Sequence, residues 1–325
     1  MKIAHLISSN TFGGIEQHVY ELANKMSEES EQIIICNKKI HSYIKDVNKV
    51  SIKIGSRYSP LNIFRLLKYL KHNKISLLHC HGAKASTIGK LIRYVSKIKV
   101  VSTIHGHKKN NKPFMKVDAV IGVNKKLLRG ISNGTYIPNW FNNNHQGKQS
   151  TRKGPILAVG RLEKVKGFDH LIQSWINIEN KLDIVGSGPE EKSLRSLIDY
   201  LNLQDKIKII TNCDYNSIEE KYRDASGLIV ASIREGGPRV LLEAINHEIP
   251  VVGTRVGIMS ELIADEFLCE PNNQRSLQSL LEEIIPLLPN LNMIALKETL
   301  KERYSIEIAA SKTKKIYDVL LNASL

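Results

Sequence analysis

The chain alternates short apolar runs with stretches in which apolar residues recur every three or four positions. The first pattern is typical of buried β-strands and the second of amphipathic helices. In the first half, strands are predicted over 3–7, 32–36, 50–54, 76–80, 99–104, 119–122 and 135–137, and helices over 15–26, 61–72 and 84–95. Strands that alternate with helices form parallel sheets covered on both faces.

The second half repeats this alternation. Its predicted strands span 156–159, 181–185, 206–210, 228–230, 251–252 and 267–268, and its helices span 168–176, 189–201, 217–223, 238–246, 276–285 and 306–321. We therefore predict an α/β chain with two doubly wound, Rossmann-like domains. The polar segment 142–154 is the best linker candidate, so the expected divisions are 1–145, 146–305 and a final helical segment 306–325. Ligands of such sheets bind at the carboxyl ends of the strands, and the cleft between the domains is the expected site.

Composition bounds the class of protein. The 325 residues are 42% hydrophobic, enough for two domains with substantial cores. Four cysteines lie far apart without metal-ligand spacing, which fits a reducing compartment and argues against a structural zinc site. The N-terminus is strand-like rather than a signal peptide, and no apolar stretch approaches the roughly 20 residues that span a bilayer. We expect a cytoplasmic protein, attached to a membrane, if at all, only at its surface.

Charge is divided unevenly between the halves. Residues 1–150 hold 25 Lys and Arg against 7 Asp and Glu, a net charge of +18, whereas residues 151–325 hold 22 against 25, a net charge of −3. This asymmetry indicates an anionic partner for the first half, either nucleic acid or an anionic membrane. The plain alternative is that the lysines only decorate solvated faces.

A basic amphipathic helix favours the membrane among these partners. The segment 61–74 carries cations at helical spacing beside an apolar face, and more follow it along the chain: Arg65, Lys68, Lys71, Lys74, Lys90, Arg93, Lys97, Lys108, Lys109 and Lys112. Such a helix can lie on anionic lipid, although more often its apolar face packs on its own sheet. The first half is poor in aromatic residues that stack on bases, so no nucleic-acid partner is expected.

The most informative motif contains Glu235 and Glu243, eight positions apart. Between them, Gly236-Gly237-Pro238 forms a turn that opens a predicted helix, and an apolar run precedes the motif. Glycine lets backbone approach a ligand closely, proline suits the first helical turn, and the N–H groups of a helix start attract anions. The pattern predicts one carboxylate at a strand end and a second about one and a half helical turns into the helix.

Two other glycine turns follow predicted strands, one with Gly13 and Gly14 and one with Gly186 and Gly188. Each presents a helix start to which a phosphate can bind, although a single such turn is more often structural. None matches GxGxxG after a strand, and no GxxxxGK[ST] motif exists, so dinucleotide and P-loop interpretations are weak. Three strand–turn–helix units in one chain favour a nucleotide site.

Cations follow the strand 156–159. Arg161 and Lys166 can neutralise a diphosphate, arginine with forked hydrogen bonds and lysine as a point charge, although a solvated loop is an equal alternative. The chain contains no Asp-x-Asp, so a diphosphate held through a divalent metal is not expected.

Histidines follow two strands of the first half: His79 and His81 on one, His105 and His107 on the next. His-x-His pairs in separate strands, without an accompanying acid, are weak indications of metal. His105 stands at the end of an apolar strand, where a hydrogen bond to substrate is plausible. The alternative is a histidine whose ring is satisfied by backbone, which is favoured for His79 and His81.

Taken together, the motifs resemble the retaining glycosyltransferases of family 4, which have the GT-B fold, nearly from end to end. The resemblance rests on five motifs in family order: Phe12-Gly13-Gly14-Ile15-Glu16, Gly160-Arg161-Leu162 through Lys166-Gly167, Gly186-Ser187-Gly188-Pro189-Glu190, Glu235 to Glu243, and Tyr304-Ser305 with Ile316-Tyr317. Their order and spacing are specific, whereas each motif alone is not. The resemblance implies that the last helix crosses back toward the N-terminal domain, that this domain binds the acceptor and that the second binds the donor.

The resemblance also implies residue roles. Arg161 and Lys166 bind the donor diphosphate, Glu243 contacts the ribose, and Gly14 approaches the phosphates. Glu235, with Gly236, Gly237 and Pro238 around it, holds the transferred sugar, and His105 contacts its hydroxyls. The expected catalytic set is Glu235, His105, Arg161 and Lys166, and the donor set adds Gly13, Gly186 and Gly188. No cofactor or metal is expected.

The resemblance implies transfer from a nucleoside diphosphate sugar to a glycan or lipid-linked acceptor of surface polysaccharide or lipopolysaccharide. We favour a UDP-sugar as the donor, and GDP-mannose is the alternative. Gly-Gly-Pro-Arg follows Glu235 where many relatives carry an aromatic residue and then glycine, and Trp140 stands where glycine is common. These departures concern sugar identity more than reaction class. A sugar-nucleotide epimerase on the same fold and a non-catalytic nucleic-acid-binding protein are the alternatives, although no acid–base pair for an epimerase is evident.

Overall fold

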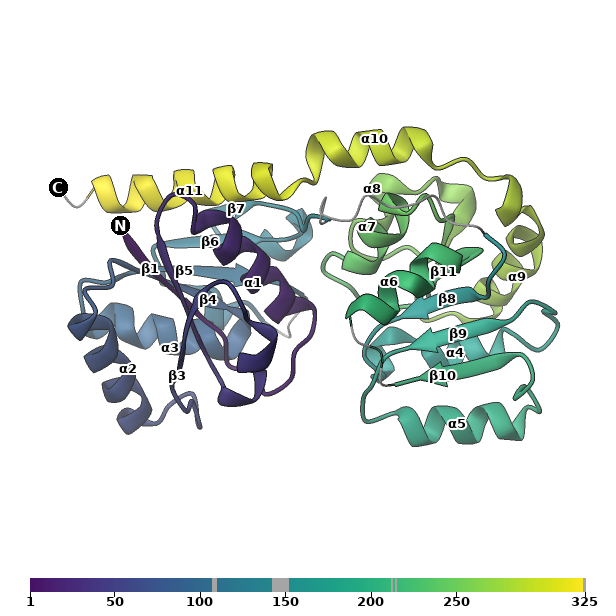
Figure 1. Ribbon diagram of the computed structural model, residues 1–325, viewed down its shortest axis with the longest axis horizontal. Coiled ribbons are helices and arrows are strands. Elements are labelled where there is room, and N and C mark those ends of the chain that lie inside the picture. Colours follow the sequence, from purple (N-terminus) through teal and green to yellow (C-terminus); the bar gives the residue numbers. More distant parts are fainter. Residues whose placement is uncertain (107–109, 142–151, 212, 214, 324–325) are drawn as a thin grey trace. The chain divides into compact units, whose positions relative to one another are not determined.

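The computed structural model describes residues 1–106, 110–141, 152–211, 213 and 215–323 (Figure 1). It divides into two compact units, one made of Met1–Trp140 with Ile306–Leu325 and one of Phe141–Ser305. The predicted boundary between residues 145 and 146, with most of the predicted linker, lies outside the described residues. Each unit is built around its own parallel sheet.

The sheet of the first unit has seven strands in the order β3-β2-β1-β4-β5-β6-β7. Because β1 pairs with β2 on one side and with β4 on the other, the strand order reverses between β1 and β4. The strands are β1 (Lys2–Leu6), β2 (Glu31–Cys36), β3 (Asn48–Ser51), β4 (Leu77–His81), β5 (Lys99–Ile104), β6 (Ala119–Gly122) and β7 (Gly134–Tyr136).

Helices cover both faces of this sheet (Figure 1). They are α1 (Gly14–Met26), α2 (Pro60–His72), α3 (Gly82–Val95) and α11 (Ile306–Asn322), with 3-10 turns η1 (Lys38–Tyr43), η2 (Lys112–Phe114) and η3 (Lys125–Leu128). Successive residues of β1 enter opposite cores: Ala4 joins α2 and α3, whereas Ile3 joins α1 and α11. The central strands β1, β4 and β5 are therefore buried on both faces. The final helix packs in the core of the first unit, as predicted.

The sheet of the second unit has the order β10-β9-β8-β11-β12-β13, and it reverses between β8 and β11. Its strands are β8 (Ile156–Val159), β9 (Leu182–Val185), β10 (Ile207–Ile210), β11 (Gly227–Val230), β12 (Val251–Thr254) and β13 (Leu268–Cys269). Its helices are α4 (Phe168–Gln173), α5 (Glu191–Tyr200), α6 (Tyr215–Asp224), α7 (Arg239–Asn246), α8 (Met259–Leu262), α9 (Gln274–Ile284) and α10 (Ile294–Arg303), with 3-10 turns η4 (Lys164–Lys166), η5 (Asp265–Phe267) and η6 (Ile285–Asn290). Two apolar clusters again cover the two faces.

Strand β3 and helix α10 are among the elements that differ from the sequence prediction. Strand β3 ends at Ser51 instead of residue 54, because its partner β2 ends at Cys36, which pairs with Ser51. Helix α10 was not predicted, because its apolar residues form no single stripe: Leu300 is buried, whereas Ile294 is exposed. Within the described part of the chain, no single helix is both long and apolar enough to cross a bilayer, and only the bent pair Gln274–Asn290 and Ile294–Arg303 meets these criteria jointly.

Candidate functional site

An ion pair joins Lys166 and Glu235 at the point where the strand order of the second unit reverses. Lys166 follows β8 and Glu235 follows β11, and these two strands are neighbours in the sheet. The side chains are 21% and 16% exposed, so the pair is largely shielded but still reachable by a ligand. Ser232 donates a second hydrogen bond to the Glu235 carboxylate, with its Oγ 3.0 Å from Oε1. Open α/β sheets bind ligands at this position.

A glycine allows this approach. Gly167 follows Lys166 with φ +66°, and a Cβ there would lie 2.2 Å from the carbonyl oxygen of Ala231. Any other residue would therefore push the loop after β8 away from the end of β11. The loop is also held by the N–H of Ile233, which donates to the carbonyl of Val165 over 2.8 Å. Glycine thus brings the lysine to the glutamate.

The turn with Gly186 and Gly188 packs backbone to backbone on the loop after β8. A Cβ on Gly186 (φ +151°) would lie 1.9 Å from the carbonyl oxygen of Gly160, and one on Gly188 would lie 2.4 Å from that of Leu162. The glycines thus make close contact between two strand ends possible. Their predicted contact with donor phosphates stays a prediction.

Glu243 lies on α7, which begins directly after Pro238 as predicted. Tyr222 donates a hydrogen bond to Glu243, with its hydroxyl 2.9 Å from Oε2. Burial raises the pKa of Tyr222 well above its usual range, and the charge of Glu243 raises it further, so the phenol stays a donor. Arg239, one helical turn earlier, has its Nε 3.9 Å from Oε1. A tyrosine and an arginine therefore orient the carboxylate.

Sequence reasoning gave Tyr222 no role, and it connected Arg239 only with sugar identity and not with Glu243. The spacing of four between Arg239 and Glu243 was a usable signal, since residues four apart share a helix face. Nothing local marks Tyr222, which reaches Glu243 only through the packing of α6 beside α7.

Arg161 does not join the Lys166 pair. Its side chain is 60% exposed and contacts Glu163 on its own loop, at 2.9 Å. Because Arg161 directly follows the end of β8, its guanidinium belongs to the same strand end as Lys166, but it is held only by a surface ion pair of small energy. Its predicted diphosphate contact stays a prediction.

The first glycine turn opens α1, with Gly13 at the N-cap and Gly14 as the first helical residue. Glu16 lies in the first turn and accepts a hydrogen bond from Ser9. One Glu16 oxygen would be 3.5 Å from a Cβ on Gly13. The helix start predicted to approach phosphate therefore already has a buried carboxylate beside it.

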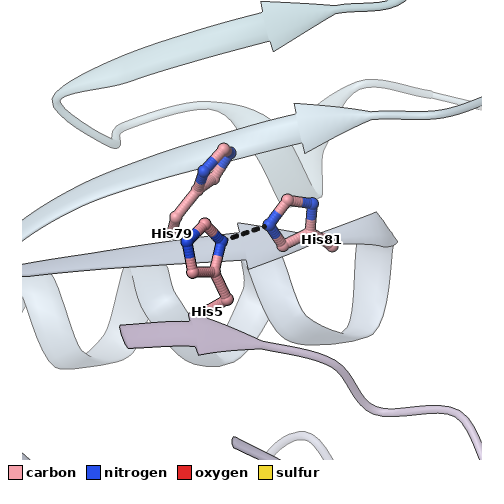
Figure 2. A group of neighbouring side chains, drawn as sticks. All are labelled: His5, His79 and His81. Atoms are coloured by element: carbon pink, nitrogen blue, oxygen red, sulfur yellow. Dashed lines mark hydrogen bonds between the residues drawn. The ribbon is translucent and has the colours of Figure 1, made fainter. Parts of the chain in front are cut away.

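The histidines of the first unit meet one another across adjacent strands. Figure 2 shows His5 from β1 with His79 and His81 from β4, and His81 in turn lies 3.3 Å from His105, which follows β5. Among the residues that the structure describes, two groups of three histidines have nitrogens within 4.8 Å of one another: His5, His79 and His81, and His18, His81 and His105.

The partners of these rings correct one expectation. His79 and His81 were expected to be satisfied by backbone, but His79 bonds the hydroxyls of Tyr317 (2.5 Å) and Thr103 (2.7 Å), and His81 bonds other histidines. Parallel strands placed side by side bring these side chains together, which spacing along the chain could not show. His107, Lys108 and Lys109 lie outside the described residues.

Two family models match the chain, one in each half. Residues 12–133 match the model described as Glycosyltransferase Family 4, and residues 141–293 match the one described as glycosyl transferases group 1. The two matched regions do not overlap, and together they cover both sheets.

Curated relatives point to the same class. One segment is 35% identical over 127 residues to an uncharacterized glycosyltransferase of Haemophilus influenzae, a match spanning 36% of this chain and 35% of that relative. An uncharacterized glycosyltransferase of Methanocaldococcus jannaschii is 25% identical over 350 residues, covering 95% of this chain and 95% of its own. An amylovoran biosynthesis glycosyltransferase of Erwinia amylovora is 35% identical over 104 residues, covering 31% of this chain and 29% of its own.

Solved structures share the fold. Sucrose-phosphate synthase of Thermosynechococcus elongatus superposes with a TM-score of 0.83 at 18% identity, over 99% of this chain and 100% of the other. The Anabaena protein HepE, solved in complex with UDP-glucose, gives 0.81 at 17% identity, over the whole of both chains.

The two sheets and the two family matches define a glycosyltransferase of the GT-B fold. The chain belongs to glycosyltransferase family 4. The predicted family, fold class and enzyme class, a hexosyltransferase, are thereby confirmed. The roles assigned to single residues stay predictions.

Proposed function

We propose that this enzyme transfers a sugar, with retention of anomeric configuration and without a metal, from a nucleoside diphosphate sugar to a glycan or lipid-linked acceptor. The acceptor belongs to surface polysaccharide or lipopolysaccharide assembly. The match to an amylovoran biosynthesis glycosyltransferase supports this setting. The first unit takes the acceptor and the second unit takes the donor.

The Lys166–Glu235 pair is the observation that carries the donor part of the proposal. Transfer develops negative charge on the departing diphosphate, and fixed cations stabilise that charge most where it develops. In this proposal Lys166 and Arg161 bind the diphosphate, and Gly14 approaches it. Glu235 binds sugar hydroxyls together with the backbone of Gly236 and Gly237. The ion pair keeps both side chains in position before the donor arrives.

The ribose and base complete the donor. Glu243 accepts hydrogen bonds from the ribose hydroxyls, because Tyr222 and Arg239 fix its carboxylate on α7. We favour a uracil base over guanine, and the UDP-glucose complex of the fold relative HepE supports that choice. A GDP-mannose donor is the alternative.

Ligand-induced stabilisation tests the donor class. A ligand that binds only the folded chain raises its Tm, by an amount that grows with affinity. UDP, GDP, ADP and a short DNA duplex are compared, each with and without EDTA. We expect UDP to give the largest shift and EDTA to leave it unchanged. Stabilisation by DNA alone would contradict the transferase proposal, and loss of the UDP shift in EDTA would contradict metal independence.

The stereochemical course is tested separately. With a UDP-α-sugar that the enzyme hydrolyses or transfers, proton NMR of the first product reports the anomeric coupling. Retention gives the α product first, and a β product would contradict the retaining assignment. Formation of an isomeric UDP-sugar instead of a transfer product would point to the epimerase alternative.

The exposed face of α2 supports a membrane partner. Arg65, Lys68 and Lys71 share this face with Leu61 and Phe64, which are 56% and 63% exposed. The opposite face packs on the sheet through Leu66 and Leu70. Cations that surround two exposed apolar side chains match an anionic lipid surface, into which the apolar groups insert. We propose that α2 attaches the enzyme to the cytoplasmic surface of the cell membrane.

Vesicle binding tests this attachment. The protein is sedimented with vesicles of phosphatidylcholine alone or with a third phosphatidylglycerol. We expect binding only to the anionic vesicles, weakened in 0.5 M salt, and lost in the double variant Arg65→Glu/Lys68→Glu. The control Lys38→Glu/Lys39→Glu makes the same charge change on η1, where both lysines are exposed. Equal loss in both variants would show that only net charge matters and would contradict a site on α2.

A further inference from the structure

A chain of hydrogen-bonded side chains leads from Gln32 to His105 through two buried histidines. Gln32 Oε1 lies 2.9 Å from His5 Nε2, His5 Nδ1 lies 3.2 Å from His81 Nε2, and His81 Nδ1 lies 3.3 Å from His105 Nε2. These residues come from β2, β1, β4 and the end of β5, which are consecutive in the sheet. Figure 2 shows the middle contact, between His5 and His81.

Gln32 sets the direction of this chain. Its amide nitrogen donates to the Ser30 hydroxyl over 2.7 Å, so its oxygen faces His5 and can only accept. The Nε2 of His5 therefore carries the hydrogen. Burial lowers the pKa of His5 to about 4, so near pH 7 the ring is neutral and has one hydrogen. Its Nδ1 is then an acceptor.

The remaining assignments follow. His81 Nε2 must donate to His5 Nδ1, because two lone pairs would otherwise face each other. Burial and the neighbouring histidines hold the pKa of His81 well below its usual range, so this ring also has only one hydrogen. Its Nδ1 therefore accepts from His105, whose Nε2 carries the hydrogen.

We propose that His81 and His5 are positioning residues that fix His105 in the tautomer with hydrogen on Nε2, so that Nδ1 accepts a hydrogen bond from a hydroxyl of the donor sugar. The inference rests on the proposed function and on the contact between His105 and that sugar which the family resemblance implies. An acceptor nitrogen attracts hydroxyl groups and repels phosphate oxygens. His105 therefore selects for a sugar that carries a hydroxyl at this position and does not bind the diphosphate.

The groups around the chain favour neutral rings. His18 lies edge-on to His105, with ring centroids 4.6 Å apart, and its Nδ1 is 3.1 Å from Asn139 Oδ1. His79 lies 4.1 Å from the His81 ring and bonds Tyr317 and Thr103. Burial lowers the pKa of His79 and of His81, as it does that of His5, so each of these three rings is neutral near pH 7 and has one hydrogen.

The same rings invite a competing interpretation as a metal site, because their nitrogens cluster within 4.8 Å. A metal needs lone pairs that converge on one point. The hydrogen-bonded chain instead places a hydrogen between successive nitrogens. Because the Gln32 amide fixes the direction at one end, the structure favours the hydrogen-bonded chain of histidines over a metal site. Bound metal is one outcome of the test.

Nitrogen NMR of the intact protein labelled with ¹⁵N-histidine measures the tautomer directly. At pH 7 we expect a protonated Nε2 and an unprotonated Nδ1 for His5, His81 and His105, assigned by single His→Gln variants. A hydrogen on Nδ1 of His105, a doubly protonated ring, or stoichiometric zinc in the purified protein would overturn the proposal. This measurement does not depend on activity, so it tests the tautomers of the three histidines even if the protein proves to have another substrate.

Steady-state kinetics test whether the hydrogen-bonded histidines position His105. His81→Gln supplies both an acceptor and a donor, whereas His81→Leu supplies neither. We expect His81→Leu to lower kcat/KM for the UDP-sugar by about tenfold or more, the equivalent of one hydrogen bond, and His81→Gln to recover most of it. UDP alone, which lacks the sugar, should bind both variants equally well.

The control is His72→Leu, which changes an exposed histidine on α2. Equal losses in His81→Gln and His81→Leu, with intact folds, would overturn the positioning role. If His81→Leu fails to fold, the NMR measurement on the wild type and the kinetics of His81→Gln still test the positioning role. Absence of transfer by the wild type from any nucleoside diphosphate sugar, with the expected tautomers present, would count against the proposed function and not against the histidine chain.

Discussion

The Tyr317 hydroxyl lies 2.5 Å from Nδ1 of His79, although 238 positions separate the two residues. Both side chains are fully buried, so this contact fastens α11 to the centre of the first sheet. A buried polar atom that loses its partner costs about 1–3 kcal/mol. Helix α11 is therefore an integral part of the first unit.

Tyr317→Phe removes this contact while keeping the ring. We expect the first unit to lose about 1–3 kcal/mol of unfolding free energy. The two tryptophans separate the units, because Trp140 lies in the first and Trp175 in the second. Urea unfolding in a Trp175→Phe background then reports the first unit alone. Tyr200→Phe, at a residue 82% exposed, is the control and should not shift the midpoint. Equal midpoints for Tyr317→Phe and the control would mean that the contact contributes nothing.

Acid should destabilise the first unit before the second. The folded pKa of His5 is about 4, below its ordinary 6.5, so between these values the unfolded chain binds more protons than the folded one. Stability therefore falls as pH drops from 6.5 to 4 and levels off below that, by about 3 kcal/mol for His5 alone. His79 and His81, whose pKa values are also lowered, act in the same direction.

Unfolding midpoints of the first unit at pH 7.5, 5.5 and 4.5 measure this effect. His5→Gln retains a donor and an acceptor but cannot titrate, so its pH dependence should be weaker than that of the wild type. A first-unit midpoint that does not change between pH 7.5 and 4.5 would show that folding does not lower the pKa values of the three rings.

The ion pair in the second unit can be tested one charge at a time. Lys166→Met should lower kcat by about 10²–10³-fold, the range for losing one charge-stabilising donor, with an intact fold. Lys164→Met is the matched control, because Lys164 is an exposed lysine on the same 3-10 turn. Steady-state release of nucleoside diphosphate gives both values. If the two variants lose activity equally, the contact with Glu235 has no special role.

Much of this fold follows from pattern alone. Strand 156–159 is a continuous apolar run and strand 99–104 is buried over five of its six residues, because both faces of each sheet are covered, and the structure reproduces the predicted bounds of both. The glycine turns could also be recognised in the sequence. The structure gives their reason, because a side chain at Gly167 or Gly186 would clash with backbone. What pattern cannot supply is the order of strands in a sheet.

Strand order determines the site. Lys166 and Glu235 meet because β8 and β11 are neighbours, and sequence separation gives no hint of it. His5 belongs to no motif and gains its place only because β1 lies beside β4, in a register that pairs it with His79. One signal was available: residues two apart on a strand point to the same face, so His79 and His81 had to share one. Identifying the residues that contact His79 and His81 still required the strand order of the sheet.

Glu243 provides the sharpest test of the nucleotide site. Its carboxylate is oriented by Tyr222 and lies near Arg239, and we expect it to bind ribose hydroxyls. Glu243→Ala should weaken UDP binding by about tenfold or more, because a charged hydrogen-bond acceptor contributes about 1.5–3 kcal/mol. Tyr222→Phe removes only the orienting hydroxyl and should give a smaller loss. Calorimetric titration with UDP measures both.

The matched control is Glu220→Ala, which removes an exposed carboxylate from α6, the helix that carries Tyr222. Its UDP affinity should equal that of the wild type. Uridine without phosphates should lose affinity in Glu243→Ala by the same factor as UDP, since the contact is with the ribose. A loss confined to UDP would instead mean that Glu243 acts on the diphosphate through Arg239, and unchanged UDP affinity would remove Glu243 from the site.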